Sequence, residues 1–149
     1  MMGSDRAVST TLGYALTLGI TTLLITGLLV GMGGFIEDQR ERAIRSELEV
    51  VGQQLAADVE AGDRFVGAGD TDFSVQRSLP NDVVGVSYRI SVVVDGTDTY
   101  LRLTTSNPAV TVEVDMALTA SIAETTVTGG QVVVTYDAGS GNLEVRSDA

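Results

Sequence analysis

The sequence contains no cysteine and no histidine, and all nine of its basic residues are arginine, so lysine is absent as well. Without cysteine, the chain can form neither disulfide bonds nor thiolate metal sites. Without histidine it lacks the commonest general base and metal ligand, and without lysine it cannot form Schiff bases. A catalytic site would have to use carboxylates, hydroxyls and arginine alone. The composition therefore predicts a protein that is not an enzyme and that uses no metal or cofactor.

Positive charge is scarce, because nine arginines stand against 20 acidic residues and the formal net charge is −11. Asp5 and Arg6 cancel one another and are the only charged residues before Glu37, so the whole excess lies in residues 37–149. An acidic surface without a basic patch argues against nucleic acid and anionic lipid headgroups as partners. Abundant Asp and Glu without Lys, together with many small residues, resembles the composition of proteins from extreme halophiles, especially haloarchaea.

One long run, Ala7–Ile36, contains no charged residue and reads as a continuous apolar helix. At ~1.5 Å per residue it would reach roughly 45 Å, whereas a bilayer core of ~30 Å needs about 20 residues. A water-soluble domain of this size cannot bury a helix that is apolar on all sides. The run is therefore expected to lie in lipid, or in a core formed by many copies of itself.

The start of the chain bears on how this run is exported. A secretory signal peptide has an apolar core of about 7–15 residues followed by a small-residue cleavage site. Here the apolar run is about twice as long, and a charged helix follows it directly. Two interpretations remain open: an uncleaved signal anchor, and a class III (prepilin-type) signal that is cleaved before the apolar helix.

The segment Asp5-Arg6-Ala7-Val8-Ser9, followed by Leu12-Gly13 and the apolar run, resembles the N-terminus of archaeal type IV pilins and pilin-like proteins, haloarchaeal members in particular. The resemblance covers residues 5–36. It implies a leader over residues 1–7 and cleavage by a membrane prepilin peptidase, with Arg6, Ala7 and Val8 as the processing site. It also implies assembly with other pilin subunits. Bacterial pilins carry a Glu at the fifth mature position, where this chain has Leu12, so the register-setting role of that Glu cannot be assigned here.

Within the expected transmembrane or filament-core helix of residues 8–36, Gly27 and Gly31 form a GxxxG pair. Such a pair lets two helix backbones approach closely. Because glycine is frequent in membrane helices generally, the pair is equally compatible with having no packing role.

Residues 37–61 change to an amphipathic period, which predicts a second half of the same helix. A single apolar stripe follows spacings of three and four residues: Ile44, Leu48, Val51, Leu55 and Val59. No proline interrupts the chain between Val8 and Ala61, and Gly62 is the expected end of the helix.

Residues 62–82 are polar and rich in Gly and Asp, which predicts a solvated linker rather than a calcium-binding loop. From Val83 the period is two, and Asp95-Gly96 is a hairpin signal. The alternation predicts an antiparallel β domain over residues 83–149, with one face packed on the helical stripe. The expected fold is therefore α+β and type IV pilin-like: a long N-terminal helix packed on a C-terminal antiparallel sheet.

Two functions follow from this pattern. The first is a structural or minor subunit of a type IV pilus-like surface filament. The second is a permanently anchored single-pass protein whose β domain binds a partner outside the cell. Arg40, Arg42 and Arg45 outnumber Arg6, and counting basic residues alone would place the β domain in the cytoplasm. The pilin resemblance requires Arg6 at the cytoplasmic face, so the β domain is expected outside the membrane.

Overall fold

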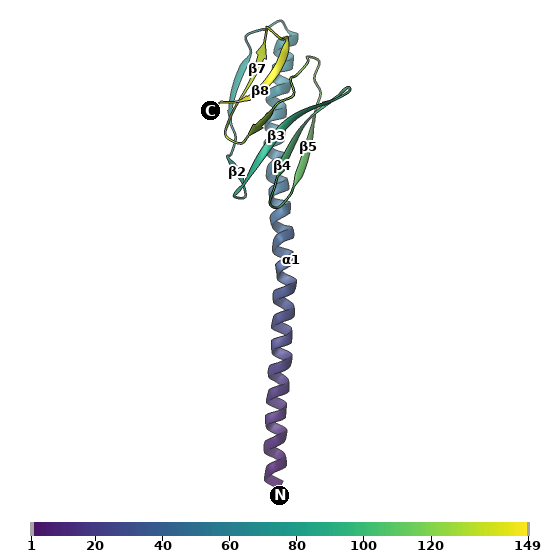
Figure 1. Ribbon diagram of the computed structural model, residues 1–149, viewed down its shortest axis with the longest axis vertical. Helices are drawn as coiled ribbons and strands as arrows, with labels where there is room; N and C mark the ends of the chain where they lie inside the picture. The colour runs from purple at the N-terminus through teal and green to yellow at the C-terminus, as the bar shows by residue number, and fades with distance from the viewer. Residues whose placement is uncertain (1, 149) are drawn as a thin grey trace. The chain divides into compact units, whose positions relative to one another are not determined.

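The computed structural model describes residues 2–148 and divides the chain into two compact units, Met1–Gln39 and Arg40–Ala149. We call the first the helical unit and the second the β unit. Helix α1 (Met2–Gly67) supplies all of the described secondary structure of the helical unit and the first element of the β unit. The strands all follow α1 in the sequence (Figure 1).

Helix α1 is longer at both ends than the sequence predicts. It begins at Met2, so the described part of the expected leader, residues 2–7, is helical. It passes through Gly62, the expected end, and stops at Gly67. A Cβ built on Gly62 would lie 2.7 Å from Cε1 of Phe73, so this glycine allows close packing instead of ending the helix. The helix ends where the N–H of Asp70 bonds the carbonyl of Phe65 and Gly69 takes a φ of +94°.

The β unit holds two antiparallel sheets, not the single sheet that the alternation predicts. The strands are β1 (Ser74–Ser78), β2 (Asp82–Val83), β3 (Val86–Asp95), β4 (Asp98–Thr105), β5 (Thr111–Met116), β6 (Thr126–Thr128), β7 (Gln131–Asp137) and β8 (Asn142–Ser147). One sheet has the order β1-β7-β8, and the other has the order β2-β3-β4-β5 with β6 also paired to β3. Alternation of apolar and polar residues predicts strands from Val83 onward, but it does not say which sheet a strand joins.

The expectation of a solvated linker over residues 62–82 is wrong. Six of these residues belong to α1, β1 pairs with β7 from Ser74 to Ser78, and β2 pairs with β3. The strand β1 is short and its partner is far along the chain, so its own sequence carries a weak signal. The β3–β4 hairpin forms where Asp95-Gly96 predicts it, with Asp95 opposite Asp98.

One hydrophobic core joins the helix and both sheets within the β unit. The five residues of the predicted helical stripe are at most 4% exposed, and they belong to the same cluster as buried residues of β3, β4, β7 and β8. Gly52 lets α1 approach the larger sheet, since a Cβ there would lie 2.7 Å from Cγ2 of Val114. The predicted α+β class, with a long helix packed on antiparallel β-structure, is confirmed.

Candidate functional site

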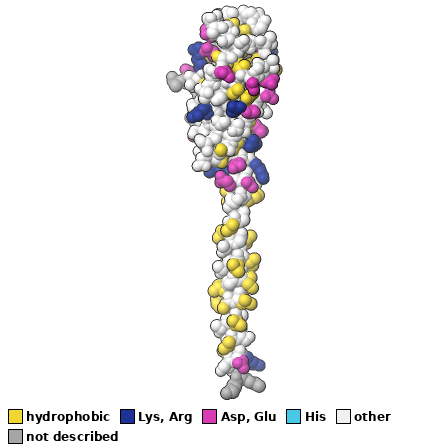
Figure 2. All heavy atoms as spheres, turned by 45° about the vertical axis from the view of Figure 1, so that its right-hand side comes forward, with side chains coloured by type: hydrophobic (Ala, Val, Ile, Leu, Met, Phe, Trp, Pro, Cys, Tyr) yellow, Lys and Arg dark blue, Asp and Glu magenta, His cyan; other side chains and the backbone are white. Residues whose placement is uncertain are grey.

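The surface of the helical unit is the most unusual feature of the chain. Every described side chain from Gly3 to Gln39 is exposed, including large apolar ones such as Leu23 and Val30 at 75% each. Figure 2 shows hydrophobic side chains along this helix, with charged side chains near its start and on the β unit. This segment is long and apolar enough to cross a membrane.

The polar groups of this helix are satisfied by the helix itself. Six threonine hydroxyls donate to the backbone carbonyl four residues earlier, at 2.8–2.9 Å: Thr10, Thr11, Thr17, Thr21, Thr22 and Thr26. A hydroxyl that is bonded in this way does not need water. The threonines therefore do not prevent the segment from lying in lipid or against other apolar helices.

The glycine pair of the predicted packing motif lies on one side of α1. A Cβ built on Gly27 or Gly31 would meet no other atom within 4 Å. Leu24, Leu28 and Phe35 are among the apolar side chains that border the hollow above the pair. The position is open and apolar, which suits the close approach of a second helix.

The predicted processing residues lie on consecutive positions of α1, and all are exposed. The carbonyl of Arg6 accepts a hydrogen bond from the hydroxyl of Thr10, and that of Ala7 accepts one from Thr11. The peptide bond between Ala7 and Val8 is therefore part of hydrogen-bonded helix. Hydrolysis there requires this turn to open first.

The polar contacts between α1 and the strands of the β unit are structural. Asp58 forms an ion pair with Arg77 of β1. Glu47 accepts a hydrogen bond from the N–H of Val84 at 3.1 Å. Asp63, which is 8% exposed, accepts hydrogen bonds from backbone N–H groups of the segment after β5. These contacts fix the sheets on the helix and present no reactive group.

Within residues 2–148, no group of three or more His, Cys, Asp or Glu side chains is arranged to hold a metal ion. In the same part of the chain, no buried side-chain nitrogen or oxygen lacks a hydrogen-bond partner. The clearest functional feature of the described residues is the apolar surface of the helical unit, whose side chains from Gly3 to Gln39 are all exposed.

Residues 3–148 match one protein family, DUF7266, a family of unknown function. The chain belongs to the DUF7266 family. The match extends over both the helical unit and the β unit. No curated protein and no solved structure matches this DUF7266 chain.

Sequence reasoning missed two residues of this DUF7266 protein that the structure singles out. Asp63 lies just past the expected helix end and was assigned to the linker, although it is a buried residue of α1. Arg89 is an exposed residue of β3 that lies between the buried Tyr88 and Ile90. The sequence gives only a weak indication of the role of Asp63, namely its position directly after Gly62, through which α1 continues. It gives no indication for Arg89, because the neighbours of Arg89 depend on the strand register.

Proposed function

We propose that the protein is a pilin-like structural subunit, processed by a membrane prepilin peptidase and held in the membrane by its apolar helix. From there it assembles with other pilin subunits into a type IV pilus-like surface filament. The single observation that carries the proposal is the helix of residues 8–36, which is uncharged and exposed on all sides while the β unit has its own closed core.

Two different surroundings can cover this apolar helix. In the membrane, lipid tails surround the apolar side chains. In a filament, the corresponding helices of neighbouring copies surround them instead. An apolar helix whose threonines bond their own backbone suits both surroundings, so transfer from one to the other exposes no apolar surface to water. The open face around Gly27 and Gly31 supports close packing against another copy.

In this proposal the β unit lies outside the cell and supplies the outer surface. Its acidic excess keeps that surface soluble, and the lysine-free, acid-rich composition supports an archaeal, halophilic source. The proposal assigns no catalytic residue and no cofactor. Its partners are the prepilin peptidase, membrane lipid and other pilin subunits.

The experiment is to shear surface filaments from cells that make the protein and to measure the intact mass of the chain in the filament and membrane fractions. The expected result is a chain that begins at Val8 and is present in filaments. A chain confined to the membrane fraction with its N-terminus at Met1 or Met2 would contradict the proposal. It would favour the alternative, a permanently anchored protein whose β domain binds a partner.

A matched pair of variants tests the packing face separately. Gly31→Leu fills the open hollow, whereas Gly13→Leu places the same side chain near the start of the helix, outside the GxxxG pair. If helices of neighbouring copies meet at the pair, Gly31→Leu reduces the filament yield more than Gly13→Leu while both chains stay in the membrane. Equal yields would mean that the pair has no packing role.

A further inference from the structure

A second feature lies on the β unit, where β2 and β6 pair with β3 one after the other. A hollow of about 380 Å³ opens there, a volume within the usual range of small-ligand pockets. Six polar side chains that line it make no hydrogen bond to the rest of the described chain. They are Asn81, Ser87, Arg89, Thr104, Ser106 and Thr128. Four of the six carry hydroxyl groups.

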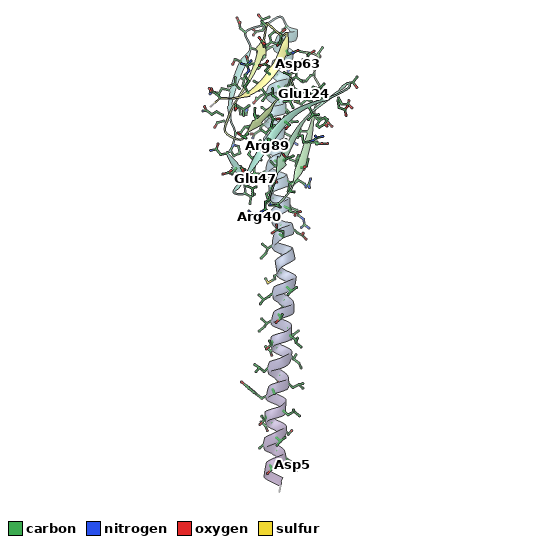
Figure 3. All side chains as sticks on the ribbon, in the orientation of Figure 1. Asp5, Arg40, Glu47, Asp63, Arg89 and Glu124 are labelled. Atoms are coloured by element: carbon green, nitrogen blue, oxygen red, sulfur yellow. The ribbon has the colours of Figure 1, made fainter. Side chains whose placement is uncertain are left out.

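The strand register places the charge among these hydroxyls. Arg89 of β3 lies directly opposite Thr104 of β4 on one side and Thr128 of β6 on the other. Residues in directly opposite register have Cβ atoms about 4.5–5.5 Å apart and share one face of the sheet. On this face of the sheet Arg89 therefore has a threonine on each side. Figure 3 labels Arg89 among the strands of the β unit.

A second arginine on the same face of the larger sheet has a carboxylate partner, whereas Arg89 has none in the described chain. Arg102 of β4 pairs with Glu113 of β5, with Nε 3.0 Å from Oε1, and also donates to the hydroxyl of Tyr100. In the described chain no carboxylate oxygen lies within 4.0 Å of the Arg89 guanidinium. Asp82 lies opposite Ser87 but does not line the hollow. Among the residues that line the hollow, Arg89 is thus the only charged one, and it forms no ion pair within the described chain.

The walls of the hollow are rigid because its other groups bond to the protein. The hydroxyl of Tyr88 donates to the carbonyl of Pro80 at 2.7 Å, and that of Thr105 donates to the carbonyl of Pro108 at 2.7 Å. Gly129 comes so close to Pro80 that an added Cβ would lie 2.4 Å from its carbonyl oxygen. A ligand would therefore meet free hydroxyls, one amide and one guanidinium on a fixed frame.

We infer that this hollow binds an acidic saccharide, with the carboxylate of a uronate on Arg89 and the sugar hydroxyls on the surrounding side chains. The planar guanidinium matches a carboxylate through two parallel hydrogen bonds. Serine and threonine hydroxyls both donate and accept, as sugar hydroxyls do, and the Asn81 amide offers both functions as well. This site does not depend on the proposed function, since it lies within the β unit.

The test uses the full ¹⁵N-labelled chain in a polyoxyethylene detergent, which has neither a sugar nor a charged headgroup. Sodium glucuronate, glucose and sodium acetate are titrated separately at constant ionic strength, and the amide shifts of Gly129 and Gly130 are followed. We expect a saturable shift with glucuronate, and at least about tenfold weaker binding of glucose and of acetate.

Two arginine variants complete the test. Arg89→Gln should weaken glucuronate binding by about tenfold or more, because it removes a charge-assisted pair of hydrogen bonds. Arg102→Gln removes an arginine from the same sheet face and should leave the affinity unchanged. The inference is overturned if glucuronate causes no saturable shift, if acetate or glucose binds as well as glucuronate, or if Arg89→Gln binds like the unmodified chain.

Discussion

The carboxylate of Asp63 accepts a hydrogen bond from the backbone N–H of Ala120 at 2.6 Å. The same carboxylate also accepts from the N–H of Thr119, at 3.0 and 3.1 Å to its two oxygens. Asp63 lies near the end of α1, and the two N–H groups belong to the segment that leaves the larger sheet after β5. One buried side chain therefore helps to fix the path of this segment before it reaches its bridge to Leu143 of β8 at Ile122.

Replacing Asp63 with alanine should lower the free energy of unfolding of the β unit by about 1–3 kcal/mol, because it leaves two partly buried backbone N–H groups without their acceptor. Chemical denaturation followed by near-UV circular dichroism measures the change. Asp115→Ala is the matched control, since Asp115 is exposed on β5, and it should stay within about 0.5 kcal/mol. A loss at Asp63 no larger than that at Asp115 would mean that water replaces the carboxylate.

The second prediction concerns Gly52, which lies against the larger sheet. Alanine favours helix over glycine by about 1 kcal/mol, but its Cβ would lie 2.7 Å from Cγ2 of Val114 and 2.9 Å from Cδ1 of Leu103. Leu103 is fully buried and cannot move aside, so overpacking of about 1–3 kcal/mol should outweigh the helix gain. Gly52→Ala should thus lower the melting temperature, whereas Gly67→Ala, which meets no atom within 4 Å, should not. Equal effects would show that the sheet shifts to accept the methyl group.

Much of the fold was predictable because its signals are local. The spacing of Ile44, Leu48 and Leu55 identifies the buried side of α1, since a helix places residues three and four apart on one face. The absence of charge from Ala7 to Ile36 identifies the apolar surface, because a helix without charged residues is apolar on every side. Both features depend only on neighbours within a few turns.

The features that the sequence did not reveal depend on partners far along the chain. Strand β1 forms because Val75 pairs with Val134 of β7, and the other four residues of β1 are polar. The division into two sheets has the same cause, since alternation fixes the buried face of a strand but not its neighbours. The hollow around Arg89 likewise depends on the register that brings Thr104 and Thr128 to its sides.

The β2–β3 hairpin carries backbone strain that a substitution can relieve. Its two-residue loop is Val84-Gly85, with φ of 49° and 71°, and a β-branched residue rarely adopts a positive φ. Asn-Gly is the preferred sequence for such a loop, so Val84→Asn should raise the free energy of unfolding by about 1 kcal/mol. Val94→Asn is the control, because both valines are 39% exposed but Val94 lies at ordinary strand φ. If Val84→Asn destabilises the chain as Val94→Asn does, the apolar contacts of Val84 outweigh its strain.

Stability at high pH should depend on Tyr88. Burial, and then the charge of Asp82, raises the pKa of its hydroxyl to about 12 in the folded chain, against about 10 when unfolded. The neutral hydroxyl therefore contributes stability that is fully present below pH ~10 and is lost as the pH rises through ~12. The difference of two pKa units corresponds to about 2–3 kcal/mol.

Tyr88→Phe separates this contribution from that of other groups. The variant should be less stable at pH 8, because it loses the hydrogen bond to the Pro80 carbonyl, but its stability should fall less between pH 10 and 12. Tyr136→Phe, a change on β7, should keep the steep fall of the unmodified chain. Equal slopes for all three proteins in urea unfolding from pH 8 to 12 would contradict the assignment.

The last prediction concerns processing at Ala7–Val8. If Arg6-Ala7-Val8 is a prepilin-type site, the mature chain begins at Val8 and keeps the whole apolar helix. Arg6→Gly combined with Ala7→Leu should block cleavage, because a bulky residue replaces the small one and the charge that holds the leader in the cytoplasm is lost. Ser4→Ala, which lies within the leader but outside the site, should be cleaved normally. Intact-mass measurement of each protein from its native membrane distinguishes the outcomes.

The structure adds a requirement to this prediction. The carbonyl of Ala7 accepts a hydrogen bond from Thr11 at 2.9 Å, so the turn that contains the scissile bond must open before hydrolysis. Thr11→Val removes that bond but keeps the shape of the side chain, and it should accelerate cleavage or leave it unchanged. Thr22→Val makes the same change far from the site and should have no effect on processing. Slower cleavage of Thr11→Val alone would mean that the peptidase recognises the hydroxyl itself.

A native N-terminus at Met1 or Met2 would contradict the pilin-like function, whereas cleavage near Gly33-Gly34 would identify an ordinary secretory signal that releases the β unit.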